Sequence, residues 1–266
     1  MLRGTRSARL VPSCHKLDWR CHWALDRIQV EYRIRPGRRL IVAKRSVPVA
    51  LLKTRKSTLR VRGIARRELL LSAARALLEE HELDEISLGD VAARAGVPKG
   101  SAYHFYDDIK DLYAALLAVT EEETLRNQGL PISEPVREWP DVIRILIRRG
   151  VALYNSDRPA CQLQIGPKTP PELKLRDRRS DFALGGIYQQ QLRACFELPD
   201  FPDAPQVFFR AVEIADLMFG LSVLETGKIT GEMCAEAERA VIAYLGTYLP
   251  EKLPRRRRVG VAQRPR

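Results

Sequence analysis

The stretch Ser87-Leu-Gly-Asp-Val-Ala-Ala-Arg-Ala-Gly-Val-Pro-Lys-Gly-Ser-Ala-Tyr-His-Phe-Tyr106 decides the fold of this chain. It predicts a short helix over Leu88–Arg94, a turn at Gly96 and a second short helix after the turn. Ser87 and Asp90 have the spacing of a capping box, and Gly96 suits the left-handed residue that ends a helix. Two short helices joined in this way are typical of a helix-turn-helix, whose second helix lies in the major groove of DNA.

The segments on both sides of this stretch are also expected to be helical. Before it, Leu69, Ala73 and Leu77 form one apolar stripe of a helix that starts near Ile64. After it, the carboxylates of residues 107 and 108 favour the positive end of a helix that runs to about residue 126. The stretch is therefore expected to be the centre of a small helical domain.

The remaining chain predicts more helices and no strands. The candidates are Val142–Asn155, Asp177–Phe196, Ala204–Gly227 and Glu232–Leu249. The last two are apolar on more than one face, which suits burial in a bundle or pairing with a second subunit. We therefore predict an all-α protein with four parts: a basic, largely disordered extension (1–60), a three-helix helix-turn-helix DNA-binding domain (61–128), a helical ligand-binding and dimerisation domain (129–250) and a basic disordered tail (251–266).

The formal net charge of +12 is unevenly distributed. Residues 1–67 hold 19 Lys and Arg against three acidic residues, whereas residues 68–251 hold 19 basic and 30 acidic residues. Basic arms attract a polyanion through counterion release without any sequence preference, although they are also compatible with simple solvated tails. A sequence-independent, nucleoid-like DNA binder is thus an alternative, against which the acidic middle of the chain argues.

Other classes of function lack a signal in the sequence. No apolar run reaches the roughly 18 residues of a membrane span, and the Arg-rich start has no adjoining apolar stretch of a signal peptide. Five widely spaced cysteines favour a reducing cytoplasm. Cys14-His15 and Cys21-His22 have no second pair at zinc-finger spacing, so neither a metal nor a cofactor is expected. No nucleophile is spaced recognisably from His104, and no phosphate-binding glycine loop is present, so an enzyme is not expected.

Residues 70–117 resemble the DNA-binding domain of TetR-type (tetracycline-repressor-like) transcriptional regulators. The residues that carry the resemblance are Ala73-Ala-Arg-Ala-Leu-Leu78, Ser87 with Asp90-Val-Ala92, Ala95-Gly-Val97, Lys99-Gly-Ser101, Tyr103-His-Phe105 and Leu112. The rest of the chain matches only in architecture. The resemblance implies a homodimer whose second domain binds a small ligand and thereby changes the separation of the two reading heads.

Three features depart from the family's pattern. Glu82 stands where the family usually has Gly after the first helix, and Ile109 occupies the position of a Lys that commonly contacts phosphate. Asp107 and Asp108 precede Ile109, and their negative charge would repel the DNA backbone. Lys110 is the neighbouring residue and is expected to supply the lost contact, although it points about 100° around the helix. These departures put the phosphate contact in question and leave the predicted fold unchanged.

The predicted function is that of a cytoplasmic, homodimeric repressor that binds a palindromic operator in double-stranded DNA and is released by a small-molecule effector. An activator is an open alternative, because the outcome depends on where the operator lies. The candidate DNA-binding residues are Ser87, Lys99, Gly100, Ser101, Tyr103, His104, Lys110 and Arg66. Lys99 can reach a guanine edge or a phosphate, and Tyr103 and His104 suit phosphate oxygens. A half-buried position in the small core is the alternative for Tyr103.

The second domain gives weaker signals. The candidate pocket residues are Tyr154, Gln162, Phe182, Tyr188, Phe209 and Met218, each of which is also compatible with a simple core position. The dimer interface is predicted on the last two helices, and its candidate residues are Leu217, Leu221, Val241 and Leu245. An arginine arm that includes Arg66 suits a narrow minor groove, with a solvated arm as the alternative.

Overall fold

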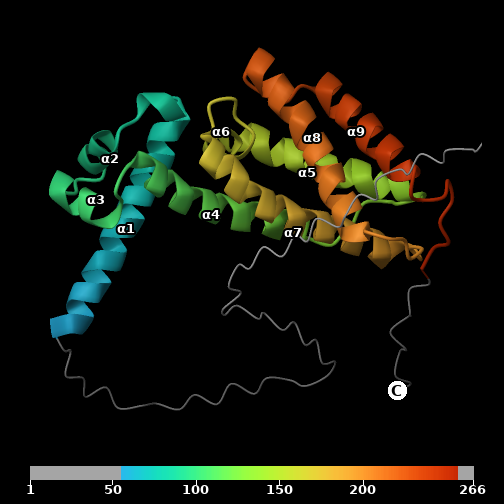
Figure 1. The fold of residues 1–266 in the computed structure, drawn as a ribbon, viewed down its shortest axis with the longest axis horizontal. Coiled ribbons are helices and arrows are strands. Elements are labelled where there is room, and N and C mark those ends of the chain that lie inside the picture. The colour runs from blue at the N-terminus through green and yellow to red at the C-terminus, as the bar shows by residue number, and fades with distance from the viewer. Residues whose placement is uncertain (1–54, 257–266) are drawn as a thin grey trace, which may run out of the picture. The chain divides into compact units, whose positions relative to one another are not determined.

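The structure is a computed structural model that describes residues 55–256 (Figure 1). The helices are α1 (Arg55–Glu80), α2 (Leu88–Arg94), α3 (Lys99–Phe105), α4 (Ile109–Gln128), α5 (Trp139–Ser156), α6 (Arg158–Gln164), α7 (Pro171–Cys195), α8 (Ala204–Thr226) and α9 (Gly231–Gly246), with one 3₁₀ turn at Leu83–Glu85. No strand occurs within residues 55–256, and the all-α prediction is confirmed. None of the helices in this range has the length and apolar character that a membrane crossing requires.

The turn signals around α2 and α3 act as the sequence predicts. The Ser87 hydroxyl accepts a hydrogen bond from the Asp90 amide at 3.2 Å, and the Asp90 carboxylate accepts one from the Ser87 amide at 2.9 Å. Gly96 has a φ of +63°, the left-handed conformation that favours glycine. The Asp108 carboxylate accepts a hydrogen bond from the Asp111 amide at 2.9 Å and so caps α4. Local hydrogen bonds therefore set the start of α2 and the start of α4, and Gly96 sets the turn between α2 and α3.

Two separate apolar cores organise the described residues. The first core joins α1 to α4 through fully buried side chains such as Leu70, Val91 and Leu112. It also includes Leu163 of α6 and Leu173 of α7, so the second half of the chain completes the first core. The second core lies among α5, α7, α8 and α9, and its largest fully buried side chains are Phe196, Phe208, Ile143, Leu146, Ile147 and Leu192. Figure 1 shows α4 running from the α1–α3 lobe alongside α7.

The starts of two helices and the presence of a third helix differ from the prediction. α1 begins at Arg55, so residues 55–60 are helical and do not belong to a disordered extension. α6 was not predicted, because seven consecutive residues that are almost all buried show no amphipathic period. α7 begins at Pro171, six residues earlier than expected, with proline at the helix start where its missing N–H costs nothing.

Residues 254–256 also differ from the predicted disordered tail. The Arg256 amide donates to the Cys195 carbonyl at 2.9 Å, and the Glu197 amide donates to the Pro254 carbonyl at 2.9 Å. These bonds satisfy backbone groups at the end of α7 and hold the chain antiparallel to it. The predictions for residues 1–54 and 257–266, including Cys14 and Cys21, lie outside the described residues.

Candidate functional site

The candidate DNA-reading helix is α3, which presents different faces to the core and to solvent. Ala102 is fully buried, and Tyr106 directly after the helix is also buried. Lys99, Tyr103 and His104 are exposed, with Tyr103 at 46%. The alternative of a half-buried core position for Tyr103 is therefore not what the structure shows. One face of α3 holds the domain together and the opposite face is free to contact a ligand.

Lys99 and Tyr103 lie close enough to act together. The Lys99 ammonium is 5.9 Å from the centre of the Tyr103 ring, within the range of a cation–π contact. Lys99 also lies over the start of α2, because a Cβ added at Gly89 would be 3.7 Å from its Nζ. Hydrogen bonds from Ser87, together with a smaller effect of the Lys99 charge, hold the pKa of Asp90 below its usual value.

The remaining predicted DNA-binding residues differ in their availability. Gly100 is exposed and Ser101 is half-buried, both on the first turn of α3. The polar atoms of Ser87 are used by the cap of α2, since its hydroxyl also donates to the Asp90 carboxylate at 2.6 Å. Arg66 is exposed on α1 and precedes in sequence the residues that form the first core. The Lys110 ammonium lies 3.8 Å from the Glu172 carboxylate of α7, an exposed pair that contributes little stability.

α6 connects the second half of the chain to the end of α1. The Gln162 amide nitrogen donates to the carbonyls of Leu78 and His81 at 2.8 and 2.9 Å, and its oxygen accepts from the Leu83 amide at 3.1 Å. All polar atoms of this buried side chain are thereby used. Gln162 is thus a structural link between the two cores and does not line an open pocket with the other predicted residues.

Charged side chains reinforce the same junction. The Arg158 guanidinium donates to the Glu82 carboxylate at 2.6 Å and to the Glu79 carbonyl at 2.7 Å. Arg75 of α1 forms an ion pair with Asp157, directly before α6. Glu82, which departs from the family's usual glycine, therefore serves as the partner of Arg158 in this chain.

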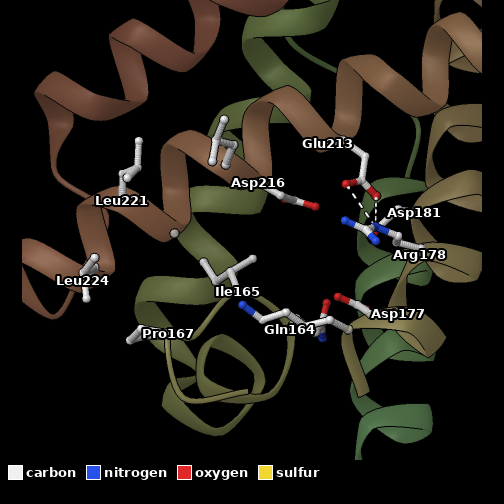
Figure 2. Close-up of a pocket in the computed structure, with 13 residues that line it drawn as sticks. Gln164, Ile165, Pro167, Asp177, Arg178, Asp181, Glu213, Asp216, Leu221 and Leu224 are labelled. Carbon is white, nitrogen blue, oxygen red and sulfur yellow. Dashed lines mark hydrogen bonds and ion pairs between the residues drawn. The ribbon is translucent and has the colours of Figure 1, made fainter. Parts of the chain in front are cut away.

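The candidate ligand pocket is a cavity of about 320 Å³ between α7, α8 and the end of α6. Figure 2 shows Asp177 of α7 and Asp216 of α8 directing their carboxylates into this space, with Gln164 beside them. Its polar lining consists of Gln164, Lys174, Asp177, Arg178, Asp181, Glu213 and Asp216, and its apolar side chains are Ile165, Pro167, Leu217, Leu221 and Leu224. The pocket is therefore acidic on one side and aliphatic on the other.

Burial and mutual repulsion raise the pKa of three carboxyl groups of this pocket, Asp177, Asp181 and Asp216. Burial, followed by the charge of Asp181, raises the pKa of Asp177 to about 9. Burial, followed by the charge of Glu213, raises the pKa of Asp181 to about 7. The same two causes, burial and neighbouring carboxylates, raise the pKa of Asp216. Arg178 partly offsets this through its ion pair with Glu213 at 3.4 Å.

The six residues predicted for the pocket lie in the described part of the chain, and none of them lines this cavity. Tyr154 and Tyr188 are buried in the second core, and Met218 packs against that core. Phe182 and Phe209 pair with each other, with their ring centres 6.0 Å apart. Tyr154 comes nearest to the cavity through its hydroxyl, which donates to Gln164 at 3.0 Å. Aromatic character therefore does not predict the lining of this cavity, whose polar side chains are mostly acidic residues of α7 and α8.

The four residues predicted for a dimer interface divide into two pairs. Leu217 and Leu221 of α8 are exposed, Leu217 at 60%. Val241 and Leu245 of α9 are completely buried in the second core of their own chain. The prediction is therefore corrected for this second pair, because side chains already enclosed by α5 and α8 are not available to a partner.

Comparisons with known proteins agree with this arrangement. Residues 70–116 match the model of a family described as bacterial regulatory proteins, tetR family. A comparison with curated protein sequences finds no match. Among solved structures, a TetR-family transcriptional regulator from Streptomyces coelicolor has 24% identity and a TM-score of 0.54, covering 68% of this chain and 98% of that one. A TetR transcriptional regulator from Rhodococcus sp. RHA1 has 19% identity and a TM-score of 0.52, covering 68% and 95%.

The fold and the matched segment are similar to those of bacterial regulatory proteins of the tetR family. Residues 70–116, which contain the helix-turn-helix, match that family's model, which confirms the resemblance drawn from the sequence. The two solved structures show that the described chain also has the fold of such regulators beyond this domain.

Proposed function

We propose that this chain is a cytoplasmic, homodimeric repressor that binds a palindromic operator and is released by a small molecule. The observation that carries the proposal is the exposed face of α3, on which Lys99, Tyr103 and His104 are unobstructed. A cationic group and a phenol on one short helix supply contacts for both phosphates and base edges. We assign DNA binding to the domain that starts with α1 and ends at residue 128, and ligand binding and dimerisation to residues 129–250.

The exposed apolar side chains of α8 support a dimer. Leu217, Leu221 and Leu224 recur at helical spacing on one face and are 60%, 41% and 63% exposed. Contiguous exposed leucines on a monomer mark a surface for another protein. A second copy that uses the same face would bury them around a two-fold axis, which is the symmetry that a palindromic operator requires.

α6 supplies a short path from the cavity to the DNA-binding domain. Gln164 and Ile165 line the cavity, and Gln162 is bonded to the end of α1. A ligand that moves the end of this seven-residue helix therefore acts on α1 through side chains only two or three positions away. If α6 can adopt two positions, an effector shifts the equilibrium between them only as far as it binds one position more tightly than the other.

The test is a gel shift on the DNA upstream of the gene that encodes this chain, at about 150 mM salt with excess competitor DNA. The full chain is compared with a chain shortened to start at Thr54, directly before α1. We expect specific binding by both, and light scattering should give the mass of a dimer.

Three results would contradict the proposal. Binding that occurs only with the full chain and that competitor DNA removes would indicate the sequence-independent binder, since the basic arms then supply the affinity. A monomer that nevertheless binds one half-site would contradict the dimer. A reporter gene that becomes more active when the protein is bound would indicate an activator.

A further inference from the structure

We propose that the cavity between α7 and α8 binds an organic cation, an amine with an apolar body, as the effector of this regulator. The inference rests on the proposed function, because it names the ligand class of the same pocket. It is argued from the charge, burial and hydrogen bonding of the residues that line the cavity.

Asp177 is the central observation. Its side chain lies at the cavity and is only 6% exposed. Its Oδ1 atom has no hydrogen-bond partner among the described residues. A buried carboxylate oxygen that is left without a donor is costly, and native structures normally supply a partner. The missing partner is a donor that enters the cavity.

The surroundings of Asp177 specify the charge of that donor. Asp181 lies one turn further along α7, and Asp216 lies on the facing helix α8. Arg178 is engaged by Glu213 at 3.4 Å, so its charge is already shared with another carboxylate. An uncharged donor would satisfy one oxygen of Asp177, whereas a cation would in addition interact favourably with the ionised forms of Asp177 and of the partly buried carboxyl groups beside it.

The pKa values of the carboxyl groups that line the cavity point in the same direction. The pKa of Asp177 is raised to about 9 and that of Asp181 to about 7 by burial and mutual repulsion. A cation in the cavity would favour the ionised forms, so its binding should release protons near neutral pH. The titratable or charged groups that act on Asp177 or line the cavity with it are Glu121 of α4, Tyr154 of α5, Lys174, Arg178 and Asp181 of α7, and Glu213 and Asp216 of α8.

The remaining lining favours an organic group over a bare metal ion. No cluster of three or more His, Cys, Asp or Glu side chains within the described residues has the arrangement of a metal site. Opposite the carboxylates lie Ile165 and Leu221 (Figure 2), and Leu217 also lines the cavity, so its apolar side suits an aliphatic or aromatic body. The volume of about 320 Å³ is at the lower end of typical ligand pockets, which favours a compact molecule.

A positively charged side chain from a second copy is the competing occupant. Leu217, Leu221 and Leu224 line the cavity and also belong to the proposed dimer surface, so a partner lies close to its opening. An Arg or Lys of the partner in the cavity would couple the carboxylates to dimerisation. A free cation would instead leave the oligomeric state unchanged. The experiment separates these two cases.

The experiment is isothermal titration calorimetry of the full chain with three cations of different size: phenethylammonium, benzyltrimethylammonium and tetrapropylammonium. The neutral control is 2-phenylethanol and the anionic control is phenylacetate. We expect saturable binding of at least one cation, with release of protons at pH 7, and no comparable binding of either control. Asp177→Asn should weaken this binding by about 10-fold to 100-fold, because a charge-assisted hydrogen bond is lost.

Asp200→Asn serves as the matched control, since the Asp200 side chain is 99% exposed on the loop before α8. It should leave cation binding unchanged. Equal binding of 2-phenylethanol, failure of all three cations, or unchanged affinity in Asp177→Asn would each overturn the inference. Loss of the dimer in Asp177→Asn would also overturn it and would assign the carboxylates to a partner's cation.

A separate gel shift distinguishes failure of the inference from failure of the proposed function. A chain that binds its operator specifically but ignores all three cations overturns only the ligand class. A chain that binds a cation through Asp177 but shows no specific DNA binding supports the chemistry of the pocket and overturns the repressor proposal.

Discussion

The α2–α3 region and the α6–α8 region of this chain are built on opposite principles. In the first, nearby residues satisfy one another: Ser87 and Asp90 exchange hydrogen bonds, and Asp108 caps the next helix. In the second, Asp177 is buried with an unpartnered oxygen and lies near other carboxylates. A region whose helix starts are capped by its own side chains is suited to hold a constant shape on DNA. An unsatisfied region is suited to change when a ligand arrives, because the ligand supplies the missing interaction.

The largest expected effect is on DNA binding by the first region. Combining Lys99→Ala with Tyr103→Ala should weaken binding to the operator by about 100-fold or more, since each lost contact to a base or phosphate costs roughly 1–3 kcal/mol. The dimer should stay folded, because both side chains are exposed. Gel shifts and circular dichroism measure the two properties. Lys228→Ala, at an exposed lysine after α8, is the control, and unchanged affinity in the double variant would remove α3 as the reading helix.

The junction between the two regions should be the next most sensitive place. Gln162→Leu leaves the Leu78 and His81 carbonyls and the Leu83 amide without their partner. We expect the free energy of unfolding to fall by about 2–4 kcal/mol, because buried polar groups lose their hydrogen bonds.

Gln190→Leu is the matched control, since Gln190 is exposed on α7. Chemical denaturation of both variants provides the measurement. A Gln162→Leu variant as stable as the control would show that α6 does not hold the two cores together, and it would remove the proposed path to α1.

The packing of α7 against α8 should tolerate no side chain at its closest point. A Cβ at Gly185 would lie 2.7 Å from the Phe209 amide nitrogen and 2.8 Å from the Phe208 carbonyl carbon, both backbone atoms. Gly185→Ala should therefore cost about 1–3 kcal/mol in the free energy of unfolding. Gly186→Ala has open space and should instead stabilise α7 by up to about 1 kcal/mol. Thermal melts that rank the two variants in the opposite order would contradict this close contact.

The smallest expected effect is an increase in stability. When the pKa of a carboxyl group is higher in the folded than in the unfolded state, its contribution to the free energy of unfolding falls as the pH rises between the two pKa values. For Asp177 this window runs from about 4, the unfolded value, to about 9 in the folded chain. Asp177→Asn should therefore raise the free energy of unfolding by about 1 kcal/mol at pH 8, with a smaller gain at pH 5.

Thermal melts of wild type and Asp177→Asn at both pH values test this prediction, with Asp200→Asn as the exposed control. Destabilisation by Asp177→Asn at pH 8 would show that the carboxylate already has a stabilising partner. That result would weaken the contrast between the α2–α3 region and the α6–α8 region.

The sequence predicts the first region well because its signals are local. The cap at Ser87, the left-handed residue at Gly96 and the cap at Asp108 each act within a few residues, and short-range hydrogen bonds depend little on the rest of the fold. The exposed residues of α3 that are proposed to face DNA follow from the register of a single helix. Ser87 is the exception, since its role as a helix cap already uses its hydrogen-bonding atoms.

The second region could not be predicted in the same way because its contacts join distant segments. Asp177 and Asp216 are on different helices, and by spacing alone such carboxylates are typical of a solvated face. α6 is too short and too buried to show a period. Val241 lies on a helix with more than one apolar face, and only the packing of α9 within its own chain determines which face is enclosed.

The most direct test of the account is a hydroxyl-radical footprint of the full chain on the DNA upstream of its gene. A dimer that reads DNA through α3 predicts two protected half-sites related by two-fold symmetry, with centres about 10 base pairs or a small multiple apart. Both half-sites should be lost together in the variant that combines Lys99→Ala with Tyr103→Ala. Protection that is uniform along the fragment, or that persists in this variant, would contradict a sequence-specific regulator that reads DNA with α3.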